Sequence, residues 1–163
     1  MKKYKRPYEY KDEMVRKLQK YNPIIHENKD NIDEACTIEI KNRNSHSLFI
    51  DLEEEFIISY GPWHDHYYCE DREDYEAALE KVLNVLNNKD CILVFYSNNK
   101  LFGSGTSLNK NKYTKEETIE FLKSFFPNEF PIFLKEYGAK IEIKYWDENK
   151  NYEIFIDKEK FMV

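Results

Sequence analysis

The sequence predicts a single α+β domain over residues 1–163, with about four helices packed on a largely antiparallel sheet of about seven strands. Two observations lead to this fold class. Alternating apolar segments follow one another through short polar turns, as antiparallel hairpins do, and helical repeats of apolar residues carry capping residues. No Ser/Gly-rich linker, repeat or low-complexity tract interrupts the chain, so the sequence offers no boundary for a second domain.

The first part of the chain predicts one helix and three strands. Apolar residues recur at helical spacing over residues 7–21, and Asn22 and Pro23 end this pattern. The three predicted strands are residues 35–42, 47–52 and 56–60. The acidic run at residues 53–55 is expected on the turn between the last two strands.

Capping patterns place the helices in the rest of the chain. Asp71 begins a predicted helix that runs to about Asn87, and Thr114 and Glu117 form a capping box at the start of another. A short helix over residues 128–137 is expected to end at Gly138. The predicted strands of this part are residues 91–96, 100–106, 141–145 and 152–156. Because residues 91–96 are apolar on both faces, we expect that strand in the middle of the sheet.

Negative charge is concentrated in one stretch of the sequence. The formal net charge of the chain is −6, whereas residues 51–80 hold eleven Asp or Glu against the single Arg72. Residues 1–20 are basic, with eight Lys or Arg against three acids. An acidic field repels phosphates and attracts cationic proteins or metal ions, so we predict no direct binding of nucleic acid.

The sequence predicts a cytoplasmic protein without membrane association. Its longest apolar runs are far shorter than the roughly 20 residues that cross a bilayer, and its basic N-terminus leads into acidic residues instead of an apolar signal segment. Cys36, Cys69 and Cys91 have no CxxC spacing and are expected to be reduced thiols. The sequence leaves the oligomeric state open.

Chemically capable residues are densest at residues 63–71, between a predicted strand and a predicted helix. If the strand continues, His64 and His66 project from one face and Asp65 from the other, a spacing that suits two ligands of a divalent metal such as zinc. The sequence does not identify a third ligand. One interpretation is therefore a metal-binding protein or metal-dependent enzyme, and the other is that both histidines are ordinary surface imidazoles.

The same segment also has the composition of a protein-binding surface. It combines large amphipathic rings with fixed negative charge, which is typical of interface hot spots and would steer a basic protein toward it. The predicted partner-binding residues are Trp63, Tyr67, Glu70, Asp71 and Asp74. Cys69 is not expected to act as a nucleophile, because the surrounding acids raise the pKa of a thiol. We predict no catalytic residue.

Two glycines lie in the predicted strand over residues 100–106. Gly103 and Gly105 complete neither of the common phosphate-binding motifs. Glycine inside a strand lets a bulge form or a large ring lie against the backbone. We therefore predict a steric role for both residues.

Residues 56–67 (FIISYGPWHDHY) and 95–105 (FYSNNKLFGSG) carry a resemblance to known proteins. With the acidic helix between them, they are similar to small uncharacterised bacterial proteins that look like the immunity partners of polymorphic or contact-dependent toxins. The resemblance covers about residues 51–105 and implies a cytosolic protein that blocks a secreted toxin domain, often a basic nuclease, through an acidic and aromatic surface. The main hypothesis is thus a non-enzymatic binding protein.

Overall fold

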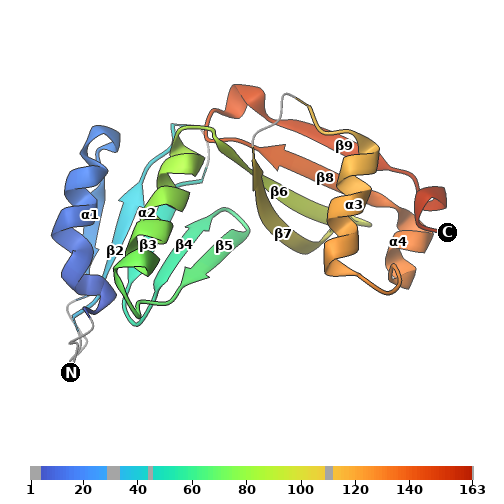
Figure 1. Ribbon diagram of the computed structural model, residues 1–163. Coiled ribbons are helices and arrows are strands. Elements are labelled where there is room, and N and C mark those ends of the chain that lie inside the picture. Colours follow the sequence, from blue (N-terminus) through green and yellow to red (C-terminus); the bar gives the residue numbers. More distant parts are fainter. Residues whose placement is uncertain (1–4, 29–33, 44–45, 109–111, 163) are drawn as a thin grey trace. The chain divides into compact units, whose positions relative to one another are not determined.

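The computed structural model describes residues 5–28, 34–43, 46–108 and 112–162, and it confirms an α+β fold (Figure 1). The chain divides into two compact units, residues 1–87 (unit 1) and residues 88–163 (unit 2), where the sequence predicts one domain. Each unit has its own antiparallel sheet, so the described strands number nine in two sheets instead of about seven in one. None of the described helices is both long and apolar enough to cross a membrane.

Unit 1 is a five-stranded sheet in which each strand pairs antiparallel with the next one along the chain. Its elements are a 3₁₀ turn (Pro7–Tyr10), α1 (Lys11–Lys17), a second 3₁₀ turn (Gln19–Tyr21), β1 (Ile24–Glu27), β2 (Cys36–Ile40), β3 (Leu48–Leu52), β4 (Phe56–Tyr60), β5 (Trp63–Tyr67) and α2 (Arg72–Leu86). The three predicted strands and the helix that begins after Asp71 are confirmed, whereas residues 7–21 form a short α-helix between two 3₁₀ turns. β5 was considered only as a continuation of the preceding strand. β1 was not predicted, because none of its residues is buried and its sequence shows no apolar alternation.

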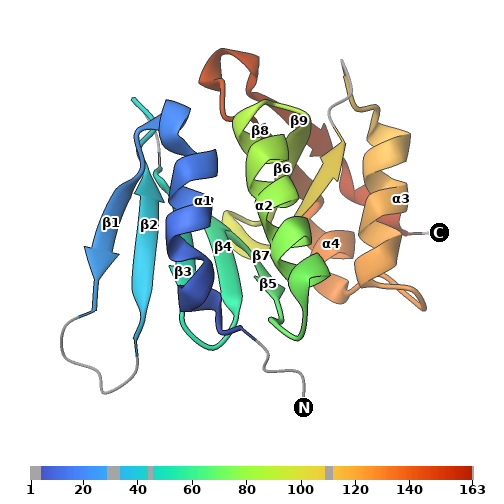
Figure 2. The ribbon, with the colours of Figure 1, turned by 60° about the vertical axis from the view of Figure 1, so that its left-hand side comes forward.

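The two α-helices of unit 1 lie on the same face of its sheet (Figure 2). Every second residue of β2, β3 and β4 is buried, which is the pattern of a sheet covered on one face. An aromatic trio joins the first turn, the sheet and α2: Tyr10 stacks on Tyr75 with ring centroids 4.4 Å apart, and Phe56 lies 6.0 Å from each. The other face has no described helix of unit 1 on it, and we call it the open face.

Unit 2 is a four-stranded antiparallel sheet with two helices. Its elements are β6 (Asp90–Ser97), β7 (Lys100–Leu108), α3 (Lys115–Phe125), α4 (Ile132–Tyr137), β8 (Ala139–Lys144), a 3₁₀ turn (Glu148–Lys150), β9 (Tyr152–Ile156) and a last 3₁₀ turn (Lys158–Phe161). The order β7-β6-β8-β9 places β6 inside the sheet, as its apolar faces predicted. α4 begins later than predicted, since a residue before proline avoids helical geometry and Pro131 is the N-cap.

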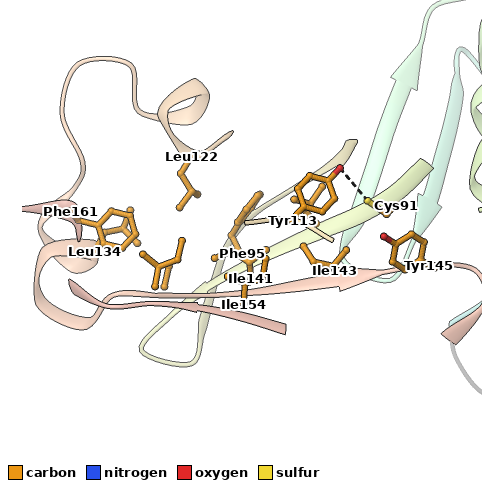
Figure 3. Packing of buried hydrophobic residues seen from close by; sticks show 13 residues of the cluster. Cys91, Phe95, Tyr113, Leu122, Leu134, Ile141, Ile143, Tyr145, Ile154 and Phe161 are labelled. Atoms are coloured by element: carbon orange, nitrogen blue, oxygen red, sulfur yellow. Dashed lines mark hydrogen bonds between the residues drawn. The ribbon is translucent and has the colours of Figure 1, made fainter. Parts of the chain in front are cut away.

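Aromatic and aliphatic side chains together form the core of unit 2 (Figure 3). Phe95 of β6 is fully buried, and its ring centroid lies 5.6 Å from that of Phe121 and 5.4 Å from that of Phe125, both on α3. A Cβ added at Gly105 would lie 3.2 Å from Cζ of Phe121, and one at Gly103 would lie 3.8 Å from Cε1 of Phe125. The strand register also shifts beside Phe95. The predicted steric role is confirmed at Gly105, where the ring of Phe121 lies close to the backbone, whereas a Cβ at Gly103 would make only ordinary van der Waals contacts.

Candidate functional site

The tight β4–β5 hairpin fixes the direction of every side chain in the Trp-His-Asp-His segment. Gly61 begins the two-residue turn with a φ of +58°, which glycine adopts without the strain of a side chain. Tyr60 then pairs with Trp63, and Ser59 pairs with His64. Since side chains alternate along a strand, Trp63 points to the face covered by the helices, whereas His64 and His66 share the open face. The predicted placement of the two histidines is confirmed.

The aromatic residues of the junction differ sharply in exposure. Trp63 retains 3% of its surface and belongs to the core, so it cannot serve as the exposed anchor that the sequence predicted. Tyr67 is half-buried, and its hydroxyl donates a hydrogen bond to Oδ2 of Asp65 at 2.9 Å. Tyr68, which was left out of the predicted contacts, is 70% exposed. A two-residue turn pairs Trp63 with Tyr60, so the two side chains share the buried face of the sheet. The Gly-Pro turn was therefore the sequence signal that could have placed Trp63 in the core.

The histidine pair has a defined geometry on the open face. The ring centroids of His64 and His66 are 5.2 Å apart, and Nδ1 of His66 lies 2.7 Å from Oε1 of Glu55. Glu55 comes from the β3–β4 turn, which the pairing of Ile57 with His66 brings beside β5. Within the described part of the chain, no group of three His, Cys, Asp or Glu side chains could hold a metal ion.

Most acidic residues of the 51–80 stretch gather at one end of unit 1. Phe56 at the start of β4 pairs with Tyr67 at the end of β5, so the β3–β4 turn and the segment leading into α2 leave the sheet at the same end (Figures 1 and 2). We call the seven acids of these two segments the acidic end: Glu53, Glu54, Glu55, Glu70, Asp71, Glu73 and Asp74. The cluster of charge in the sequence is therefore, for the larger part, also a cluster in space.

Two of these acids have a structural role in helix α2. Asp71 is the N-cap, and its Oδ1 accepts hydrogen bonds from the backbone N–H groups of Glu73 at 2.9 Å and Asp74 at 3.1 Å. Asp74 completes the capping box by accepting from the backbone N–H groups of Glu70 at 2.8 Å and Asp71 at 3.2 Å. Their charge also suits the positive end of the helix dipole. Asp71 and Asp74 thus stabilise the N-terminus of α2, and this role does not depend on a partner.

Of the other five acids of this end, Glu55 contacts His66 and the remaining four have no described side-chain partner. Among the described ion pairs and side-chain hydrogen bonds, none involves the carboxylates of Glu53, Glu54, Glu70 or Glu73, and all four residues are exposed. Basic residues also reach this end, since the carbonyl of Lys5 accepts a hydrogen bond from Sγ of Cys69. Four uncommitted carboxylates remain available to an external cation or cationic side chain.

A pocket lies beside the β3–β4 turn, toward the open face. It has a volume of about 430 Å³, and the three glutamates of residues 53–55 line it together with Thr37, Asp51 and Ile57. Thr37 donates a hydrogen bond to Oδ1 of Asp51 at 2.5 Å. The pocket therefore extends the acidic surface from the turn onto the open face of the sheet.

Cys69 lies at the acidic end but does not have the environment of a nucleophile. Burial raises the pKa of its thiol to about 11, and the negative charges of Asp74, Glu9 and Asp71 act in the same direction. A nucleophilic cysteine needs a lowered pKa. The expectation that Cys69 is unreactive therefore has a structural basis.

Comparison of the chain with protein-family models, with curated proteins and with solved structures finds no match.

Proposed function

We propose that the protein is a non-enzymatic binding protein that holds a basic protein partner at the acidic end of unit 1. The observation that carries this proposal is the pairing of Phe56 with Tyr67, which brings the acidic turn and the acidic start of α2 to the same end of unit 1. Like charges held together repel one another and destabilise the fold. A cationic partner relieves that repulsion and gains affinity from it.

The charge of the two units supports the same location. Unit 1 holds 13 Lys or Arg against 19 Asp or Glu, whereas unit 2 holds 12 of each. The whole net charge of −6 therefore belongs to unit 1. Complementary fields of this kind raise the association rate of a basic partner and favour it over acidic competitors.

The exposed residues at this end define the proposed contact surface. Tyr68 supplies an amphipathic ring that is 70% exposed, and Glu70 and Glu73 follow it along the chain. Glu53 and Glu54 supply charge from the neighbouring turn. Aromatic residues commonly anchor interfaces, and Tyr68 replaces the buried Trp63 in this role.

The partner class that we propose is a secreted toxin domain with a basic surface, such as a nuclease, and the protein would act as its cytoplasmic immunity partner. This finer proposal rests on the resemblance of residues 51–105 and on the sign of the charge at the acidic end. A basic nuclease carries positive charge where it binds nucleic acid phosphates. An acidic protein surface can occupy that region and block it.

If a gene beside this one encodes a large secreted protein with a basic C-terminal domain, that protein is the toxin candidate for the test. Its basic C-terminal domain is purified, and the association rate with the protein is measured by stopped-flow fluorescence at about 50 and 500 mM salt. The quadruple change Glu53→Gln, Glu54→Gln, Glu70→Gln and Glu73→Gln should lower the association rate at low salt by about tenfold or more. Asp71 and Asp74 stay unchanged because they cap α2.

The matched control removes four exposed acids from unit 2 instead: Glu116→Gln, Glu120→Gln, Glu136→Gln and Glu159→Gln. The control variant changes the net charge of the protein by the same amount as the first variant. A difference between the two variants therefore shows that the position of the charge matters, and not only the net charge. Tyr68→Ala should mainly raise the dissociation rate. Equal effects of the two quadruple variants, or association that ignores salt, would contradict the proposed surface.

A further inference from the structure

His64 and His66 form a pair of exposed imidazoles that the proposed function does not use. Both lie on the open face of β5, and the side chain of His66 is 45% exposed. Two imidazoles that share one tetrahedral ion at a metal–nitrogen distance of about 2.1 Å have ring centres roughly 5 Å apart. The observed separation of the two centroids is 5.2 Å. The centroid separation of the two rings is therefore compatible with a shared ion.

Glu55 sets which nitrogen of His66 is available to an ion. An ionised carboxylate can only accept a hydrogen bond, so the contact of 2.7 Å between Oε1 of Glu55 and Nδ1 of His66 places the ring proton on Nδ1. The lone pair then resides on Nε2, on the far side of the ring. A carboxylate behind a ligating histidine is the usual second partner in metal sites, where it fixes the tautomer and raises the basicity of the ligand.

We propose that His64 and His66 chelate one divalent transition-metal ion of the zinc class, with Glu55 as a positioning residue and solvent in the remaining coordination positions. Imidazole nitrogen is a ligand for zinc, copper and nickel, whereas magnesium and calcium prefer oxygen. The site has two protein ligands, in agreement with the lack of any three-residue group in the described part of the chain. The nearby acidic end raises the local concentration of cations.

A second histidine–glutamate pair on the same sheet provides an internal control. Nε2 of His26 in β1 lies 2.8 Å from Oε2 of Glu39, but β1 and β5 are the two edge strands of the five-stranded sheet. His26 therefore has a carboxylate partner without a second imidazole beside it. The proposed chelate needs a second imidazole, so His26 should contribute nothing to the binding of an ion.

Isothermal titration of the protein with Zn²⁺ alone, and separately with Ni²⁺ alone, tests the proposal. We expect one saturable ion per chain, at least tenfold weaker binding in His64→Ala and in His66→Ala, and unchanged binding in His26→Ala. Mg²⁺ should not compete. Circular dichroism checks that each variant is folded, and both histidines are exposed, so folding should persist. Loss of binding in His26→Ala, binding that survives both single changes, or no saturable binding would overturn the proposal.

The role of Glu55 has its own readout. Glu55→Ala should weaken Zn²⁺ binding by about tenfold, which is the lower end of the range for residues that hydrogen-bond to metal ligands. Glu55→Gln keeps an oxygen that accepts a hydrogen bond from Nδ1–H of His66, so this variant should retain most of the affinity. Long-range ¹H–¹⁵N spectra of the imidazoles should show the Nδ1–H tautomer of His66 in the unmodified protein and a shift away from it in Glu55→Ala. An unchanged tautomer would contradict the positioning role.

The two proposals can fail separately. Association with the basic domain is measured in the presence of a chelator, and the metal titration is done without any protein partner. Loss of the partner interaction in the quadruple glutamate variant therefore says nothing about His64 and His66. Retention of Zn²⁺ binding in the variant Tyr68→Ala would show that the metal site does not depend on the partner surface.

Discussion

Unit 1 and unit 2 are both antiparallel sheets with two α-helices, yet they hold different kinds of residue. Unit 1 has all four histidines, all the arginines and the whole net charge of the chain. Unit 2 has no net charge but holds nine of the eleven phenylalanines. Net charge and imidazole groups are therefore concentrated in unit 1, whereas phenylalanine is concentrated in unit 2.

The two units also differ in how their charged side chains are paired. The open face of unit 1 presents histidine and carboxylate side chains in hydrogen-bonded pairs, such as His26 with Glu39 and His66 with Glu55. Ion pairs occur in both units, but those of unit 2, such as the contacts of Lys140 and Lys144 with Glu142 along β8, belong to a unit without net charge. Paired charges of opposite sign create little field at a distance, so unit 2 offers less to a charged ligand.

The largest effect should follow from removal of an aromatic ring in the core of unit 2. Phe95→Ala deletes a fully buried ring that contacts Phe121 and Phe125, and it should lower the free energy of unfolding by about 3–5 kcal/mol. Urea titration followed by circular dichroism measures the change. Phe155→Ala is the control, because that ring is 57% exposed. Equal losses in the two variants would show that the aromatic cluster does not dominate the stability of unit 2.

The second effect concerns one glycine of each unit. A Cβ at Gly138 of unit 2 would clash with the backbone oxygen of Ile156, and the φ of this residue is +72°. Gly138→Ala should therefore cost about 3 kcal/mol, since strain and a backbone clash combine. At Gly61 of unit 1, the nearest atom is 3.1 Å away, on the side chain of His46, which can move. Gly61→Ala should cost about 1 kcal/mol. Thermal unfolding compares them, and the reverse order would refute the argument.

A smaller effect is expected at the helix caps. Asp71→Ala removes the oxygen that caps α2 and should cost about 1 kcal/mol, as should Thr114→Ala at the start of α3. Asp71→Asn keeps a capping oxygen and loses only the charge, so its stability should be nearly that of the unmodified protein. Urea titration of the three variants decides this. A large loss in Asp71→Asn would mean that the charge of Asp71, and not its hydrogen bonds, stabilises the helix.

The last prediction concerns the reactivity of the thiols and not the stability of the protein. Burial is the main cause that raises the pKa of Cys36 and of Cys69 to about 11. A raised pKa keeps the thiol protonated to higher pH, so alkylation by iodoacetamide near neutral pH should be at least about tenfold slower than that of glutathione. The rate should increase as the pH rises toward the pKa. Mass spectrometry of the modified peptides measures the rate of alkylation. Fast labelling of Cys69 would contradict the prediction that this thiol is unreactive.

Periodicity and capping were sufficient for most elements. Asp71 and Thr114 both cap helices as predicted, and each forms a capping box with the residue three positions later. The apolar run of β6 also predicted a central strand correctly. These signals are local, since a cap or a buried strand is determined by neighbours within a few residues. β1 lacked such a signal because its residues are exposed.

The candidate site was predicted less completely than the fold. Strand alternation placed His64 and His66 on one face, but it left Trp63 among the expected surface residues although that side chain is 3% exposed. The partner of His66 could not be predicted, because Glu55 lies 11 residues away in sequence and is brought close only by the β4–β5 register. The same holds for the exposure of Tyr68, which depends on where the chain leaves the sheet.

The sequence by itself determined the α+β class, the caps, the face of the two histidines and the concentration of acidic residues in one stretch. Tertiary structure alone decided that the strands form two sheets, that Phe56 pairs with Tyr67, and that two acidic segments consequently share one end of unit 1. The reason is physical: helix caps and alternation depend on short-range geometry, whereas strand pairing joins residues that are distant in the chain. The acidic surface and the histidine–glutamate contact both result from that pairing.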